Sequence, residues 1–169
     1  MARQQAFIPE VIEPDERLPA DLVALRRFAW LLDEAIAIPG TQRRIGADAL
    51  IGLVPGVGDV IGGLLSAWIV IGALRHRVPL PKIIRMLFNI LIDLLIGAVP
   101  FLGDMFDFLF EENVMNLQLL LAHRDRRQPP RTHREVAVAT LVVVAIVLMM
   151  AMIPVAVLVV TAIWLIQHR

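Results

Sequence analysis

Residues 136–166 read VAVATLVVVAIVLMMAMIPVAVLVVTAIWLI, and none of these 31 residues carries a charge. At 1.5 Å per residue an unbroken helix of this length would extend about 46 Å, whereas the hydrocarbon core of a bilayer is about 30 Å thick. The segment is too long for one upright crossing and too short for two. Either Pro154 kinks the helix, or its end projects into the headgroups with Trp164 at the interface. We predict one membrane-spanning helix over residues 136–167.

The whole chain shares this apolar character. Hydrophobic residues make up 58% of the 169 residues, charged residues only 19%, and the mean hydropathy is +0.73. Soluble domains contain about 45–50% apolar and about 25% charged residues. The apolar residues gather in three blocks separated by charged segments, and the N-terminus has no basic-then-apolar signal peptide. We therefore expect an integral membrane protein that is inserted by its internal segments.

A twelve-residue motif occurs twice in the first two apolar blocks. Residues 48–59 read DALIGLVPGVGD and residues 93–104 read DLLIGAVPFLGD, with eight of twelve positions identical. A coincidence that involves aspartate, proline and glycine together is improbable, which indicates an internal duplication.

The motif predicts a break between two helices. Proline disfavours helix at the residue before it, and glycine can adopt the positive φ of a sharp turn. The aspartate that follows can cap the next helix and interact favourably with its dipole. The break residues are Pro55, Gly58 and Asp59 in the first copy, and Pro100, Gly103 and Asp104 in the second.

The predicted fold is an all-α integral membrane protein with two duplicated helix–break–helix units and a C-terminal transmembrane helix. Residues 1–20 are expected to be flexible. A helical membrane domain follows over residues 21–123, with its two units at about 41–75 and 83–122. A basic linker over residues 124–135 leads into the transmembrane helix at 136–167.

Two further segments have amphipathic spacing. Residues 21–38 place Arg26, Arg27, Asp33 and Glu34 opposite an apolar face of Leu22, Leu25, Phe28, Ala29, Leu32 and Ile36. This helix either packs on the rest of the protein or lies on the membrane with Trp30 at headgroup depth. A second amphipathic helix is predicted to run to about Ala122.

Polar side chains within the apolar blocks are the candidate site residues. Oxygen ligands of this kind suit substrates or hard cations, and Asp93, inside an apolar helix, needs a partner or an aqueous cavity. Arg43, Arg44 and Arg85 are its candidate partners. The candidates are Asp48, Asp59, Asn89, Asp93, Asp104 and Asp107.

The sequence predicts no metal site, no cofactor and no catalytic residue. None of the acidic spacings is diagnostic of a metal, and the chain has no cysteine. The four histidines fall in or beside basic segments and are expected to be solvated. No basic stretch is interleaved with aromatic residues, so we expect no nucleic-acid partner.

The arginines at 43–44, 75–77 and 124–134 would all lie in the cytoplasm under the positive-inside rule. Each unit would then enter and leave on one face, as a re-entrant or spanning hairpin. The alternative has spanning helices over 60–74 and 82–99, which places the linker at 75–82 outside.

Four stretches resemble the domain of unknown function 4112 family: LLDEA at 31–35, IPGT at 38–41, IGLVPGVGD at 51–59 and VPFLGDMFD at 99–107. NVMNL at 113–117 also fits, so that the resemblance covers roughly residues 25–123. It implies a bacterial membrane-associated protein, and hence the inner membrane, without an established activity.

Three classes of function remain open at this point. The first is a non-enzymatic membrane protein that forms an oligomer or binds another membrane protein. The second is a small transporter or channel with a polar site at the paired breaks. The third is a membrane enzyme that uses the aspartates. We favour the first.

Overall fold

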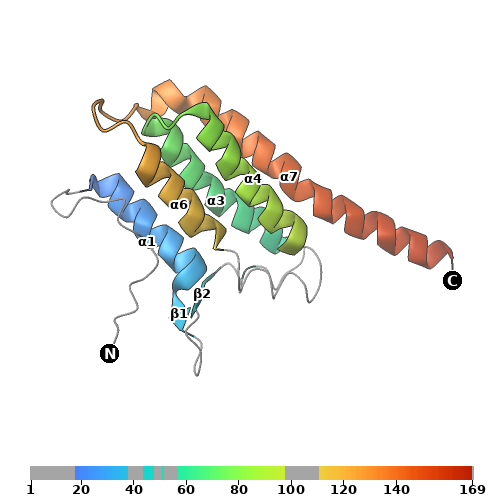
Figure 1. Ribbon diagram of the computed structural model, residues 1–169. Coiled ribbons are helices and arrows are strands. Elements are labelled where there is room, and N and C mark those ends of the chain that lie inside the picture. The colour runs from blue at the N-terminus through green and yellow to red at the C-terminus, as the bar shows by residue number, and fades with distance from the viewer. Residues whose placement is uncertain (1–17, 38–43, 48–50, 52–56, 98–110, 169) are drawn as a thin grey trace.

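The computed structural model describes residues 18–37, 44–47, 51, 57–97 and 111–168. The described part is a helical bundle (Figure 1). Its helices are α1 (Ala20–Glu34), α3 (Val57–Arg75), α4 (Leu80–Gly97), α6 (Glu112–His123) and α7 (His133–Gln167). The all-α prediction is confirmed, apart from one short pair of strands.

Helix α3 lies at the centre of the bundle and packs against α1, α4, α6 and α7. Helix α4 runs back antiparallel to it after a tight turn in which Arg77 has a φ of 59°. Helices α4 and α6 pack against each other, and α7 covers α3 and α4 from the other side. Figure 1 shows α1 and α7 at opposite sides of the bundle.

The shared core is almost wholly aliphatic. On α1 most of the predicted apolar face is confirmed, since Leu22, Leu25, Ala29 and Leu32 are buried, whereas Ile36 lies in β1 and is exposed. Leu22, Leu25 and Ala29 belong to one core cluster with residues of α3, α4, α6 and the first half of α7. Other members of the core include Ile69, Val70, Met86, Ile90, Leu117, Leu120, Leu121, Val143 and Val147.

The chain departs from the predicted helices after α1. The helix ends at Glu34 and not at residue 38, and Ile36–Ala37 (β1) pair antiparallel with Arg44–Ile45 (β2). The first duplicated unit, expected to be helical from residue 41, is therefore a strand at 44–45. The backbone of Gly46 lies so close to the end of α1 that a Cβ added to it would collide with the carbonyl of Leu32. The bare glycine allows this return strand to pass the end of α1.

Helix α7 is continuous over 35 residues and includes Pro154. A capping box starts it, in which Thr132 and Glu135 each satisfy the other's backbone amide. Val136, Val143, Val147 and Ala151 are buried against the bundle. Large apolar side chains beyond Pro154 are exposed, among them Val157, Val160, Ile163, Trp164 and Ile166. Figure 1 shows this last part of α7 extending past the other helices. In the described part of the chain, α7 is the one helix long and apolar enough to cross a membrane.

Candidate functional site: a buried polar network beside an open groove

Several of the predicted site residues lie outside the described residues. These are Asp48, Pro55, Pro100, Gly103, Asp104 and Asp107. The backbone of Gly58 and Asp59 is described and lies in the first turn of α3, which begins at Val57. Asp59 thus follows the helix start instead of preceding it as an N-cap, and Gly58 has helical backbone, not the predicted turn.

The remaining two candidates, Asn89 and Asp93, lie on α4. Asp93 is half-buried and interacts with other groups of the protein. Asn89 donates through Nδ2 to Oδ1 of Asn116 on α6, at 2.8 Å. Asn89 is therefore part of a buried polar network that the sequence did not predict.

The network continues along one face of α6. Asn116 donates through Nδ2 to Oε2 of Glu112 at 2.7 Å, and to the carbonyl of Met86 at 3.3 Å. Glu112 and Asn116 are 2% and 0% exposed. Residues four apart share a helix face, which places both side chains toward α4.

A second branch joins α1, α3 and α6. Ser66 donates through Oγ to Oδ1 of Asn113 at 2.9 Å, and Asn113 Nδ2 donates to Oδ1 of Asp33 at 2.8 Å. The other oxygen of Asp33 accepts the backbone amide of Val114 at 2.8 Å, in the first turn of α6. Asp33, although it belongs to α1, thus acts as an N-terminal cap of α6, because its carboxylate accepts a first-turn amide that has no partner within α6.

These contacts correct two predictions. Asp33 and Glu34 were expected on the polar outer side of α1, but Asp33 bonds into the bundle and Glu34 is buried. Helical periodicity predicts that charged residues face outward. It contains no information about Asn113, the partner of Asp33, which lies 80 residues away in the sequence. The signal available was the pair of asparagines, Asn113 and Asn116, set three apart among apolar residues of α6.

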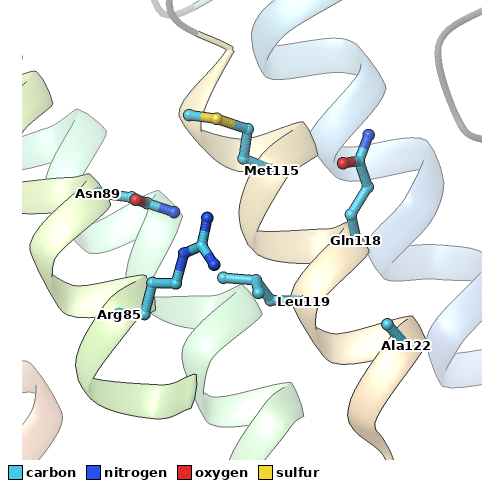
Figure 2. A pocket seen from close by; sticks show the side chains of 6 residues that line it. All are labelled: Arg85, Asn89, Met115, Gln118, Leu119 and Ala122. Atoms are coloured by element: carbon cyan, nitrogen blue, oxygen red, sulfur yellow. The ribbon is translucent and has the colours of Figure 1, made fainter. Parts of the chain in front are cut away.

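An open groove of about 310 Å³ lies next to the network, between α4 and α6. Arg85 and Asn89 line it from α4 and extend toward α6 (Figure 2). Met115, Gln118, Leu119 and Ala122 line it from α6. Asn89 therefore belongs to both the network and the groove.

A third polar cluster holds one end of the bundle together. Oδ2 of Asp21 lies 2.8 Å from Nε2 of His76 and 3.3 Å from NH1 of Arg75, and Oδ1 accepts the amide of Leu22. Burial raises the pKa of Asp21, but the hydrogen bond and charge of His76 and the charge of Arg75 outweigh it and leave that pKa below its ordinary value. His76 is buried, so the prediction of a solvated histidine was wrong for this residue.

The linker before α7 is bound to the same end. The amide of Asp125 donates to the carbonyl of His76, and that of Arg131 donates to the carbonyl of Arg75. Arg75 returns a bond from Nε to the carbonyl of Arg131 at 3.3 Å. We call this the basic end of the bundle. The cations of its two segments, residues 75–82 and 124–134, are Arg75, Arg77, Lys82, Arg124, Arg126, Arg127, Arg131 and Arg134.

Residues 21–124 match the family described as Domain of unknown function (DUF4112). The chain belongs to this family. No curated protein and no solved structure matches it.

The DUF4112 region begins at Asp21 and ends at Arg124, so it contains α1, α3, α4 and α6 with both branches of the polar network. Helix α7 lies outside it, as the resemblance implied. The network of this chain therefore lies within the family region, and α7 is an additional helix packed against that region.

Proposed function

We propose that the protein is a non-enzymatic integral membrane protein that associates with a second copy of itself. The observation that carries the non-enzymatic part is the internal pairing of the buried polar side chains. Asn89, Asn113 and Asn116 each bond to another side chain of the bundle. Hydrogen bonds of this kind stabilise a helix bundle. Asn113 and Asn116 are fully buried, so neither is presented to a substrate.

Membrane residence is supported by α7 and by the faces beside it. A 30 Å hydrocarbon core centred on the uncharged stretch would cover about 20 residues, roughly 141–161. Val136 and Trp164 would then each lie about 5–8 Å beyond the core, within the headgroup regions. One crossing therefore places both ends of the uncharged stretch in the headgroup regions. The basic end of the bundle lies at the cytoplasmic headgroups in this arrangement.

The apolar surface of the bundle fits the same placement. Helix α4 carries an exposed apolar stripe of residues three or four apart, and α3 and α7 expose further apolar side chains. These faces suit acyl chains. The α4 stripe consists of Leu80, Ile84, Phe88, Ile92 and Leu95.

The opposite side of the bundle suits a protein partner better than lipid. Helix α1 exposes Arg27 together with Trp30 and Leu31. A charged side chain facing hydrocarbon is costly. Aromatic and arginine side chains are enriched at protein interfaces. A second copy that covers α1 accounts for this mixture.

Transport is the less supported alternative. It requires several polar groups along an aqueous path. Of the described candidates, Asn89 lines the groove but is hydrogen-bonded to Asn116, and Asp93 is half-buried and interacts with other groups of the protein.

The prediction that all three arginine groups lie on the cytoplasmic side needs revision. Arg44 lies beyond the C-terminal end of α1, whereas Asp21 and Arg75 meet at its N-terminal end.

Oxidative cross-linking tests the association in this cysteine-free chain. We expect Arg27→Cys to form disulfide-linked dimers in native membranes, and the matched variant Phe88→Cys on the apolar stripe to remain monomeric. Absence of dimers for Arg27→Cys, or equal dimer formation by both variants, would reject the α1 interface. Recovery of the protein in the supernatant after alkaline extraction would reject membrane integration.

A further inference from the structure

We propose that the groove between α4 and α6 binds the phosphate headgroup of an anionic phospholipid through Arg85. The proposal rests on the membrane placement described above. The proposed function does not include a ligand, and this proposal assigns one to the groove that Asn89 lines.

Arg85 supplies the charge for this site. In the part of the chain that the structure describes, no hydrogen bond or ion pair joins its guanidinium to another residue. Figure 2 shows the guanidinium held over the groove, between α4 and Leu119 of α6. A guanidinium has five donors in a planar fork that matches the oxygens of a phosphate.

The rest of the groove is compatible with an anion. Among the described residues that line it there is no acid. Asn89 uses Nδ2 to bond Asn116, and because an amide nitrogen carries two hydrogens, a second donor remains beside Arg85. The bond to Asn116 also fixes the orientation of the amide, so that this donor is held in place before a ligand arrives.

The groove has an apolar side on which acyl chains can lie. Met115, Leu119 and Ala122 line it from α6. On α4, Arg85 borders the exposed apolar stripe, next to Ile84 and one turn before Phe88. A ligand with a phosphate at one end and hydrocarbon at the other matches this arrangement, whereas a free anion would leave the apolar lining uncovered. The volume, about 310 Å³, falls at the lower end of the range for ligand pockets, about 300–1,000 Å³.

The depth of Arg85 agrees with the position of a phosphate. It lies five residues after Leu80, so about 7.5 Å along α4 from the basic end. A long basic side chain at that depth reaches the headgroup layer. Lys82 lies one turn closer to the basic end and adds positive charge. Basic pockets between membrane helices on the cytoplasmic side bind anionic headgroups.

The test measures lipid selectivity of the full-length protein in nanodiscs that contain phosphatidylglycerol and phosphatidylcholine. Native mass spectrometry counts the lipids that each released protein retains. We expect the wild-type protein to retain phosphatidylglycerol in preference to phosphatidylcholine. Arg85→Gln should weaken that preference about tenfold, the scale of one charge-assisted hydrogen-bonded pair. Arg85→Lys should restore part of it, and Arg26→Gln, which removes an arginine of α1 that does not line the groove, should leave it unchanged.

Three results would overturn the proposal. They are equal retention by Arg85→Gln and the wild type, equal retention of the two lipids by the wild type, and displacement of phosphatidylglycerol by inorganic phosphate, which would indicate a free-anion site. Helicity of each variant is measured in the same nanodiscs. Loss of selectivity in a helical variant that still resists alkaline extraction concerns the lipid site alone. Extraction of the wild-type protein would instead overturn the membrane placement and the lipid site together.

Discussion

Ser66 and Asn113 are 47 residues apart in the sequence, and the Oγ of Ser66 donates to the Oδ1 of Asn113 at 2.9 Å inside the bundle. The same asparagine donates to Asp33, so a single amide connects α3, α6 and α1. Hydrogen bonds of this kind specify which helices pack together, because a different packing would bury the same groups without partners.

Replacement of Asn113 by Ala should therefore destabilise the bundle. The substitution removes the hydrogen-bond partner of Ser66 and one hydrogen bond to Asp33, and a buried group that loses its bond costs about 1–3 kcal/mol. Thermal unfolding in detergent should show a lower midpoint. Gln128→Ala, which removes an exposed amide from the linker, is the matched control and should unfold like the wild type. Equal midpoints for all three proteins would show that the network contributes no stability.

The cluster at Asp21 predicts a dependence on pH. Because the pKa of Asp21 is lowered by folding from an ordinary value of 3.8, the ionised carboxylate stabilises the folded state above that pH. This contribution is lost as the pH falls through the folded pKa. We expect Asp21→Asn to unfold more easily than the wild type at pH 7, by about 1 kcal/mol. The two proteins should converge below pH 3.8, and a difference that stays constant from pH 7 to that range would contradict the assignment.

Neighbouring glycines on α3 provide a test of the contact between α3 and α7. A Cβ on Gly63 would lie 3.1 Å from Cγ1 of Val147, whereas a Cβ on Gly62 would have no atom within 4 Å. Gly63→Leu should destabilise the bundle by about 1–3 kcal/mol, because the added side chain pushes α7 away. Gly62→Leu should be neutral or stabilising by up to about 1 kcal/mol, since glycine is a poor helix former. Similar unfolding midpoints for the two variants would mean that α7 does not dock on this face.

The bonds between the linker and α3 predict resistance to proteolysis. Arg131 bonds through its amide to Arg75 and through NH1 to the carbonyl of Leu74. Arg131→Ala should loosen the linker and speed trypsin cleavage after Arg126 and Arg127. Arg77→Ala, which removes one exposed contact at 3.5 Å, should have little effect. Unchanged cleavage rates in Arg131→Ala would show that the side-chain bond does not hold the linker.

Periodicity predicted the helices and their apolar faces. The spacing of Leu22, Leu25, Ala29 and Leu32 in α1 reflects local burial, which a helix records in its own sequence. The uncharged stretch of α7 predicts a long apolar helix without reference to any other segment. The match of residues 21–124 also confirmed the family assignment.

Pairing between distant polar residues was not predictable in the same way. In the sequence, Glu112 and Asn113 resemble the polar start of the amphipathic helix α6. Asp33 resembles the polar end of a different helix, α1. Their burial depends on partners that are brought together only by the fold. His76 was misjudged for the same reason, because its neighbours in sequence are arginines while its partner in the structure is Asp21.

The central claim is that α7 crosses the membrane and leaves the basic end of the bundle in the cytoplasm. The most direct test introduces single cysteines at two exposed positions, Arg127 in the linker and Gln167 at the end of α7, into the cysteine-free chain. A membrane-impermeant maleimide applied to intact bacterial cells should label Gln167→Cys and should label Arg127→Cys only after permeabilisation. Labelling of both positions, of neither, or of Arg127→Cys alone in intact cells would contradict the account.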